Sequence, residues 1–532
     1  MESPDAFVGR MLRLLEVERS AEIEETSSLL DSLSGPQLEA RGVSLLRLVV
    51  AEEGAGLGGR ILLGLEKTTG EALPPTRIQP GDIVRLVPPD PAGSGRAKTD
   101  ERRTASGVVW RKNARRVTVA FDDLPEDGVG DGALRLDRVA NDVTYRRMRK
   151  ALERLRALDR GRPAQLREIL LGEKEPRFGA PRPLEPLSAR LNPSQIEAVR
   201  HALSALDVAL IHGPPGTGKT TAVCELIRQA VGRREKVLAA APSNIAVDNL
   251  AEILAAAGAR VVRLGHPARL LPSVVELSLD AQVDAHPHTR IAQDLRRDLA
   301  RALKRLGRSR DFEARRAARE ELRALRREIA EVESGAVKAI LDGADVVLAT
   351  CAGADDPVLN GLEFQLAVID EAAQALEPAA WIPILRADRV VLAGDHRQLP
   401  PTIISREAAR DGLGVTLFDR LMARAGDRIS RLLTVQYRMH RSIMEYPSRQ
   451  LYGGRLEAAP AVAEHTLSGL EGIQEAPASL EPLWFIDTAG CSYEEALEAD
   501  GDSKENPSEA EAAARHAEAL VELSLPRCRH QI

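Results

Sequence analysis

Residues 210–226 read LIHGPPGTGKTTAVCEL, and this run constrains the fold of the chain more than any other. It places a glycine-rich loop between an apolar, strand-like segment and a helix-like segment. The loop matches the pattern G-x-x-x-x-G-K-[ST], in which glycines let backbone N–H groups and the following helix N-terminus face phosphate oxygens. The predicted ATP-binding residues are Gly213, Pro214, Pro215, Gly216, Thr217, Gly218, Lys219, Thr220 and Thr221. Of these, Lys219 would neutralise the β- and γ-phosphates, and the Thr220 hydroxyl would ligate Mg²⁺.

Strand, loop and helix alternate from residue 207 to residue 400. Six short apolar runs mark the strands: DVALIHG, KVLAAAP, RVVRLG, ADVVLATC, LAVIDEA and RVVLAGD. Uninterrupted apolar runs of this length are typical of strands that are buried on both faces of a parallel sheet. The pattern therefore predicts a doubly wound α/β domain around the phosphate-binding loop.

Two adjacent carboxylates follow the fifth of these strands. The run LAVIDEAAQALEP places Asp370 and Glu371 at the tip of an apolar strand. Such a pair can divide the work of hydrolysis, with Asp370 in the Mg²⁺ shell and Glu371 polarising the attacking water. An acidic N-cap of a helix after a buried strand is the alternative. The phosphate-binding loop upstream favours hydrolysis.

The sixth strand ends in a dense polar loop, VVLAGDHRQLPP. A polar side chain at a strand tip beside the γ-phosphate can report its presence to whatever the loop contacts. Gln398 is the candidate for that sensor. A surface turn with a capping aspartate is the alternative.

The chain before the α/β domain divides into four predicted segments. Residues 1–40 predict an N-terminal stalk helix, and residues 141–175 predict a second one. Five or so β-rich runs, separated by Gly, Pro, Asn and Asp, predict a small β-barrel over residues 41–140. Prolines mark a linker over residues 176–190.

The rest of the chain is predicted as an ATPase domain over 191–425 and a partial second domain over 426–532. A helical insertion over 275–340 interrupts the first of these. It is basic, with 14 Arg/Lys against 7 Asp/Glu between residues 290 and 328. Both a solvated helical hairpin and a nucleic-acid-contacting face fit that composition. In the second domain, RLLTVQYRM and PLWFIDT predict strands of a second sheet, and residues 505–524 a helix docked on it.

Composition excludes several classes of protein. Hydrophobic residues make up 44% of the 532, and no apolar run reaches the ~18–20 residues of a membrane span, so no membrane partner is expected. The chain opens without a secretory signal, which predicts a cytoplasmic protein, with a monomer as the default. The four cysteines form no Cys-x-x-Cys pair. Because the net charge is −6, nucleic-acid binding would need local basic surfaces.

A series of ordered motifs resembles a known family. The strings are LNPSQIEAV, GPPGTGKTT, APSNIAVDNL, VVRLGHPARL, VVLATCAGA, DEAAQALEP, GDHRQLPP and VQYRMHRSIMEYPSRQLYGGRL. In this order they resemble superfamily 1 DNA/RNA helicases of the 5′-to-3′ group. Within that group the chain is most similar to the subgroup of immunoglobulin-mu-binding protein 2 and the nonsense-mediated-decay helicase. The resemblance covers almost the whole chain.

The resemblance implies a fold and a function. The fold would be a RecA-like P-loop NTPase domain with a β-barrel inserted on a helical stalk and an inserted helical hairpin, plus a partial second RecA-like domain. The function would be that of an ATP- and Mg²⁺-dependent helicase or translocase. It would move 5′ to 3′ on single-stranded DNA or RNA as its two domains close and reopen around ATP.

The resemblance also implies roles for individual residues. Gln195 would read the adenine edge, and Arg438 would reach the γ-phosphate from the second domain. Ser243, Asn244 and Thr350 would touch the nucleic-acid backbone from loops at sheet ends. Short hydroxyl and amide donors hold phosphates without reading sequence, so binding should tolerate sequence and weaken with salt. Ser243 and Asn244 could also serve as a helix N-cap, and both roles can hold together.

The late motifs of the family it resembles have no counterpart after Glu522. They include arginines that complete the ATP site, and a transition-state arginine contributes about 10³–10⁵ in rate to phosphoryl transfer. We therefore expect a C-terminally incomplete chain that binds nucleotide but unwinds poorly or not at all. The alternative function is a truncated, nucleotide-gated nucleic-acid-binding protein without unwinding. A P-loop ATPase that remodels proteins is disfavoured, because Gln195 and GDHRQLPP have no place in it.

Overall fold

The computed structural model describes residues 2–55, 60–88, 104–121, 124, 133–139, 142–181, 183–308, 312–497 and 504–523. Residues 524–532 lie outside these ranges. The chain divides into two compact units, which are described separately below. Unit 1 comprises Met1–Ala189, Val199–Ile211 and Thr220–Arg431, and unit 2 comprises Arg190–Ala198, His212–Lys219 and Leu432–Ile532.

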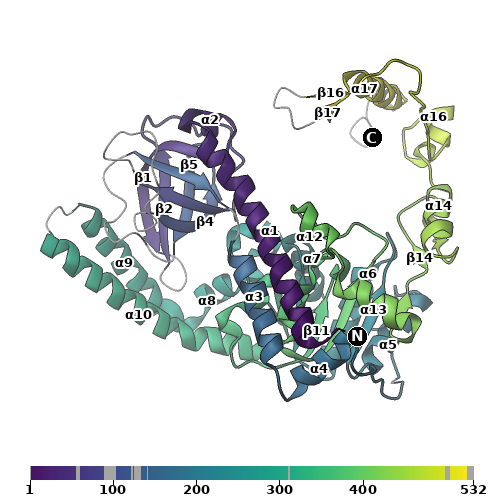
Figure 1. Cartoon of the computed structure of the whole chain (residues 1–532), viewed down its shortest axis with the longest axis horizontal. Helices are drawn as coiled ribbons and strands as arrows, with labels where there is room; N and C mark the ends of the chain where they lie inside the picture. Colours follow the sequence, from purple (N-terminus) through teal and green to yellow (C-terminus); the bar gives the residue numbers. More distant parts are fainter. Residues whose placement is uncertain are drawn as a thin grey trace. The chain divides into compact units, whose positions relative to one another are not determined.

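Two helices from distant parts of the sequence lie side by side in unit 1. The first, α1 (Pro4–Ser32), begins at Ser3, whose hydroxyl accepts a hydrogen bond from the Ala6 N–H at 3.2 Å. The second is α3 (Asp142–Ala157), and Figure 1 shows it running along α1. Apolar residues at helical spacing are buried in one shared core: Phe7, Met11, Leu14, Met148, Leu152 and Leu155. This packing holds the first half of α1 against α3. The predicted stalk helix over 1–40 divides, because α1 ends at Ser32 and residues 35–40 form the separate helix α2.

Between these two helices the chain forms a closed six-stranded barrel. Its strands are β1 (Ser44–Ala55), β2 (Ile61–Lys67), β3 (Ile83–Val87), β4 (Ala105–Lys112), β5 (Arg116–Phe121) and β6 (Leu134–Arg138), in the order β1-β2-β5-β4-β3-β6. The sequence suggested five or so strands because the run at 105–124 looked continuous. It folds instead into the hairpin β4–β5, since the Asn113 side chain accepts hydrogen bonds from the backbone N–H groups of Arg115 and Arg116.

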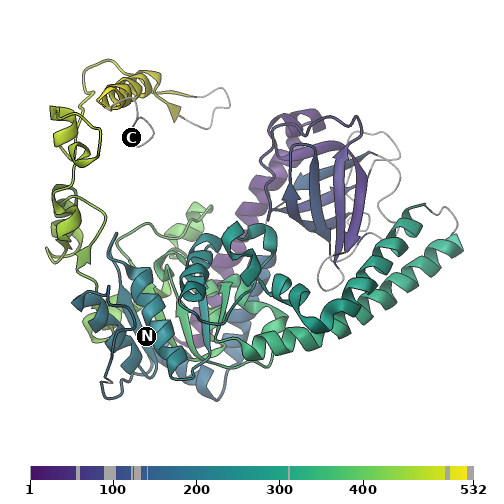
Figure 2. The same ribbon diagram turned by 180° about the vertical axis from the view of Figure 1, so that it is seen from behind.

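The basic segment after residue 288 forms a helical hairpin of α9 (Arg290–Arg308) and α10 (Phe312–Gly343). Figure 2 shows the two long helices running beside the barrel. Their apolar stripe joins the barrel core through Leu299, Ala302, Leu322 and Ile329. One face of the hairpin is therefore packed rather than solvated. On its polar face, ion pairs such as Arg297–Asp294 and Arg301–Asp298, both 2.8 Å, offset part of the positive charge.

A seven-stranded sheet forms the centre of unit 1, in the order β13-β7-β12-β11-β8-β10-β9. The strands are β7 (Val208–His212), β8 (Val237–Ala241), β9 (Val261–Arg263), β10 (Val346–Thr350), β11 (Phe364–Ile369), β12 (Ala387–Gly394) and β13 (Ser430–Leu432). Strands β8 to β12 pair in parallel, and β7 and β8 are buried along their whole length. All six predicted strands are present, which confirms the α/β fold of this region.

The remaining helices are distributed over the two units. They are α2 (Gly35–Ala40), α4 (Arg162–Leu171), α5 (Pro193–Ser204), α6 (Lys219–Gly232), α7 (Asn244–Ala256), α8 (Leu279–Ala285), α11 (Glu377–Ile384), α12 (Arg406–Arg410), α13 (Leu417–Ala425), α14 (Arg441–Leu451), α15 (Pro460–Ala463), α16 (Pro477–Leu480) and α17 (Pro507–Glu522). In the part of the chain that the structure describes, no helix is both long and apolar enough to cross a membrane.

The predicted second sheet is wrong in two respects. The run at 431–439 splits, because β13 (Ser430–Leu432) joins the seven-stranded sheet while β14 (Val435–Gln436) pairs with β15 (Glu457–Ala458). The run at 482–488 forms no strand, and its Phe485 side chain is 88% exposed. A strand exists only where a neighbour bonds its backbone groups, and no described residue pairs with this run. The predicted helix forms as α17, but it buries no residue.

Candidate nucleotide and nucleic-acid site

The predicted phosphate-binding loop connects β7 to α6. Gly216 and Gly218 have positive φ angles of 74° and 72°, a region that glycine enters without steric cost. A Cβ atom at Gly213 would lie 2.7 Å from the Lys219 Cβ, so the turn is too tight for a side chain. The Thr217 hydroxyl donates to the Pro214 carbonyl at 2.7 Å. This glycine-lined curl fits the phosphates of a nucleotide.

Two residues from other parts of unit 2 contact this loop. Gln195 is 3% exposed, and its amide nitrogen donates to the Thr217 carbonyl at 2.9 Å. The loop segment with Arg438 is held from the other side, since the Tyr437 N–H donates to the Gly216 carbonyl at 2.8 Å. The exposed Arg438 side chain begins beside the loop, where a Cβ at Gly216 would lie 2.6 Å from the Arg438 Cβ.

Gln436 was not among the predicted site residues, although it shapes this contact. Its side chain is fully buried, and its amide oxygen accepts hydrogen bonds from the N–H groups of Arg438 and Met439 at 2.8 and 2.7 Å. The amide thereby fixes the backbone turn from which Arg438 extends. In the sequence, only its position two residues before Arg438 in the run VQYRMH could have indicated this role.

The two predicted metal-binding residues meet in unit 1. The Thr220 hydroxyl donates to the Asp370 carboxylate at 3.3 Å. Asp370 is 2% exposed and directly follows β11, so the parallel sheet carries it to the same edge as the start of α6. Hydroxyl and carboxylate oxygens are the ligands that Mg²⁺ prefers, and the donor set therefore fits this ion.

Glu371 stands in an unusual backbone conformation beside Asp370. Its φ and ψ angles are 53° and 35°, in the left-handed region that non-glycine residues avoid. The turn is confined, since a Cβ at Gly394 in the neighbouring β12 would lie only 2.9 Å from the Ala373 N–H nitrogen. Backbone strain of this kind collects at functional sites, where the surrounding structure maintains it.

The candidate sensor lies at the end of β12. The Gln398 amide nitrogen donates to the Asp395 carboxylate at 2.7 Å, and Asp395 also accepts from the Arg397 N–H at 3.0 Å. Asp395 is buried and Gln398 is exposed. The capped turn that was the alternative explanation is therefore present. It also holds the Gln398 side chain in one place, and the sensor role stays a prediction.

The three predicted nucleic-acid-binding residues lie at one edge of the sheet. Thr350 ends β10 opposite Ala241 of β8, and Ser243 and Asn244 follow β8. The side-chain oxygen of each of these residues accepts a hydrogen bond from another group of the protein. The Ser243 hydroxyl accepts from the Ala246 N–H at 3.3 Å, the Thr350 hydroxyl from the Gly353 N–H at 3.0 Å, and the Asn244 amide oxygen from Arg263 at 2.9 Å.

This arrangement leaves hydrogen-bond donors of Ser243, Asn244 and Thr350 at this edge of the sheet, which we call the donor edge. Each hydroxyl keeps its proton, and Asn244 keeps its NH₂ group, to offer to a ligand. Phosphate oxygens only accept hydrogen bonds, so they match such an edge. Ser243 is also the N-cap of α7, and capping is what occupies its oxygen.

Comparison with known proteins decides the family. Residues 190–406 and 413–532 match two family models that are each described as an AAA domain, and residues 8–134 match the model described as Helicase SMUBP-2/HCS1, 1B domain. The DNA polymerase alpha-associated DNA helicase A of Schizosaccharomyces pombe is 32% identical over 535 residues, covering 98% of this chain and 80% of that protein. The chain belongs to the superfamily 1 helicases.

Other helicase relatives extend this result. The DNA-binding protein SMUBP-2 of Mus musculus is 44% identical over 530 residues, covering 97% of this chain and 52% of that protein. The Regulator of nonsense transcripts 1 homolog of Arabidopsis thaliana is 33% identical over 82% of this chain and 33% of that protein. The chain therefore spans about half the length of the SMUBP-2 relatives. The family predicted from the ordered motifs is confirmed.

A buried ion pair behind the edge that carries Ser243, Asn244 and Thr350 was also not predicted. Arg263 in β9 and Asp248 in α7 are 0% and 1% exposed at their side chains, with 2.8 Å between them. A signal was present in the sequence, because RVVRLG carries a charge inside an apolar strand, and a buried charge needs a partner. The sequence did not indicate which residue that partner would be.

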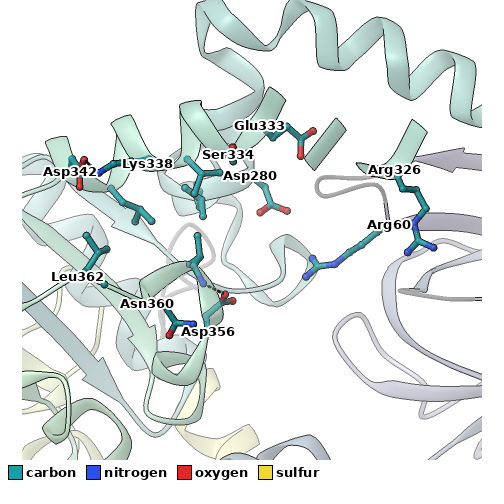
Figure 3. Close-up of a pocket in the computed structure, with 15 residues that line it drawn as sticks. Arg60, Asp280, Arg326, Glu333, Ser334, Lys338, Asp342, Asp356, Asn360 and Leu362 are labelled. Carbon is teal, nitrogen blue, oxygen red and sulfur yellow. Dashed lines mark hydrogen bonds and ion pairs between the residues drawn. The ribbon is translucent and has the colours of Figure 1, made fainter. Parts of the chain in front are cut away.

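A separate pocket of unit 1 contains none of the predicted site residues. It encloses about 730 Å³ between α8, α10, the loop at 356–362 and Arg60 of the barrel (Figure 3). One buried oxygen of Asp280 in this pocket has no hydrogen-bond partner among the described residues. Burial raises the pKa of Asp280 to about 6. Its charge therefore changes near neutral pH.

Proposed function

We propose that this chain contains the motor of an ATP-dependent helicase that moves 5′ to 3′ along single-stranded DNA or RNA. One observation carries the proposal. The hydroxyl of Thr220, at the end of the phosphate-binding loop, lies 3.3 Å from the buried carboxylate of Asp370. That pair is what an Mg²⁺-dependent nucleotide hydrolase needs, and the relatives of the chain are helicases.

The roles proposed on the nucleotide side follow from the chemistry of each group. Lys219 would neutralise the β- and γ-phosphate oxygens, and Thr220 and Asp370 would hold Mg²⁺. Glu371 would accept a proton from the attacking water. ATP, when bound, supplies the phosphoanhydride bond whose hydrolysis releases free energy. Held by Thr220 and Asp370, Mg²⁺ would supply positive charge beside the phosphate oxygens during this hydrolysis.

Three further residues would link the nucleotide to the rest of the motor. We propose that Gln195 reads the adenine edge, and its burial against the Thr217 carbonyl supports a place beside the nucleotide. Arg438 would bring positive charge to the γ-phosphate, supported by its anchorage at Gly216. Gln398 would signal the state of the γ-phosphate through the loop that Asp395 holds.

The roles proposed on the nucleic-acid side rest on the donor edge of Ser243, Asn244 and Thr350. Donors that bind phosphate oxygens hold a strand without reading its bases. Binding should therefore tolerate any sequence and weaken as salt rises. We also propose that the helical hairpin is an insertion in a RecA-like ATPase domain, because sheet strands β9 and β10 precede and follow it in the chain. The barrel would be an insertion on a helical stalk, because α1 and α3 flank it in the chain.

Two measurements on the purified chain test the function. The first is the ATP hydrolysis rate with and without an oligo-dT or oligo-U strand. The second is the displacement of a labelled strand from duplexes with a 5′ or a 3′ single-stranded tail. Strand-stimulated hydrolysis is the expected result, and any unwinding by this chain should be weak and confined to the 5′-tailed duplex. Unwinding of the 3′-tailed duplex would overturn the direction. Stimulated hydrolysis without displacement would favour a nucleotide-gated binding protein, and hydrolysis insensitive to strands would overturn the proposal.

A matched pair of variants assigns the hydrolysis to the proposed site. Glu371→Gln should reduce the hydrolysis rate by about 10²–10⁴ while nucleotide binding persists, because a general base of this kind contributes that much. Glu363→Gln removes an exposed carboxylate just before β11 and should leave the rate unchanged. Equal hydrolysis rates for the two variants would show that Glu371 is not the general base.

A further inference from the structure

The guanidinium of Arg263 is divided among three partners. Its Nε donates to the Asp248 carboxylate at 2.8 Å, its Nη1 to the Leu264 carbonyl, and its Nη2 to the Asn244 amide oxygen at 2.9 Å. The other oxygen of Asp248 accepts from the Leu271 N–H at 2.8 Å. Both charged side chains are almost fully buried.

This geometry determines how the Asn244 amide is turned. A guanidinium has donors and no acceptor, so only the amide oxygen can face it. The amide is planar, and its NH₂ group must then project on the side away from Arg263. Asn244 is half-buried, and no described residue accepts a hydrogen bond from its NH₂ nitrogen. The NH₂ group is thus held as an outward donor.

An ordinary role in stability does not explain this choice of residues. A buried ion pair is seldom more stabilising than well-packed apolar side chains of the same volume, because both charges lose their hydration. A lysine would satisfy Asp248 with a single ammonium, whereas the planar fork of arginine also reaches Leu264 and Asn244. The hydrogen bond to Asn244 is the one made by the second terminal nitrogen, Nη2, of the guanidinium.

We propose that Arg263, itself fixed by Asp248, is a positioning residue that holds the Asn244 amide with its NH₂ group directed at a nucleic-acid phosphate. This proposal rests on the proposed function, in which the donor edge binds the strand backbone. It adds that a buried cation, which does not touch the strand, determines how well the strand is held.

A double-mutant cycle tests the proposal on the full chain. The variants are Arg263→Lys, Asn244→Ala and the two combined, with Arg260→Lys as the matched control. Arg260 is an exposed arginine paired with Asp345, and its replacement should change neither the strand affinity nor the ATP affinity. The affinity for a fluorescent oligo-dT strand, the affinity for ATP and the melting temperature are measured for each.

The expected pattern separates positioning from a general structural effect. Arg263→Lys should weaken strand binding about two- to tenfold, the worth of one hydrogen bond, while ATP affinity stays the same. In the Asn244→Ala background the same change should have almost no effect on strand affinity, although it still lowers the melting temperature. Equal weakening in both backgrounds, or no weakening in either, would overturn the proposal.

A second variant serves if Arg263→Lys fails to fold. Asn244→Asp keeps an oxygen for Arg263 and preserves the buried pair, but it turns an anionic oxygen outward where the NH₂ group stood. It should bind the strand more weakly than Asn244→Ala at an equal or higher melting temperature. Binding as strong as that of Asn244→Ala would contradict the positioning. If the parent chain binds no strand, the proposed function fails, whereas normal parent binding with unaffected Asn244 variants defeats only this inference.

Discussion

Replacing Glu371 with glycine should stabilise the protein while it reduces the rate of ATP hydrolysis. Glu371 stands at φ 53° and ψ 35°, where the Cβ of any L-residue crowds the backbone. Alanine at the same position lacks the carboxylate as well, but it keeps the Cβ. The Gly and Ala variants therefore differ in backbone strain and in the flexibility of the unfolded chain, and both lack the proposed general base.

The size of the difference follows from two opposing effects. The left-handed conformation costs an L-residue about 1–2 kcal/mol, and glycine avoids this cost. Glycine also makes the unfolded chain more flexible than alanine does, and this lowers the free energy of unfolding by about 0.4–1 kcal/mol. The Gly variant should thus be more stable than the Ala variant by about 1 kcal/mol.

Urea unfolding followed by tryptophan fluorescence measures this difference, since Trp381 is fully buried in the same unit. The matched control is Glu328, an exposed residue in the interior of α10. At this position the Gly variant should be less stable than the Ala variant by about 1 kcal/mol. Glu328 has helical backbone angles, so glycine relieves no strain there. The reasoning is refuted if Glu371→Gly unfolds at the same or a lower urea concentration than Glu371→Ala.

Three further outcomes are expected. Lys219→Ala should weaken ATP binding by at least about tenfold in calorimetry, because it removes a charge-assisted hydrogen bond; unchanged binding would contradict the assigned loop. Asp280→Asn should raise the free energy of unfolding by up to about 3 kcal/mol at pH 8 and by nothing at pH 3. Burial raises the pKa of Asp280 from 3.8 to about 6, so the native state is penalised as pH rises through this range, and a gain independent of pH would disprove this. Gly353→Ala should weaken strand binding about two- to tenfold, since its Cβ would lie 2.8 Å from the Thr350 hydroxyl, whereas Gly335→Ala in open space should not.

The sequence predicted the elements whose signals are local. The phosphate-binding loop and the six apolar strands were readable because glycine spacing and continuous apolar runs act within a few residues. The same holds for Asp370 and Glu371, since the end of a buried strand in a parallel sheet identifies the edge where they lie. For these residues the order of the motifs also identified the family.

The tertiary structure decided what depends on distant partners. The chain at 430–432 joins the seven-stranded sheet, and the apolar stripe of α9 and α10 meets the barrel. The local sequence of a strand or an amphipathic helix indicates that it must pair or pack with another element. It does not identify that element, which can lie far along the chain.

The donor edge shows the same division in the candidate site. The sequence by itself determined that Ser243, Asn244 and Thr350 supply short polar side chains near strand ends. Only the folded chain determined that their oxygens are occupied, because Arg263 lies 19 residues from Asn244 and the Thr350 oxygen faces a turn. Hydrogen-bond direction depends on which groups meet in space, and composition and spacing along the chain do not specify that.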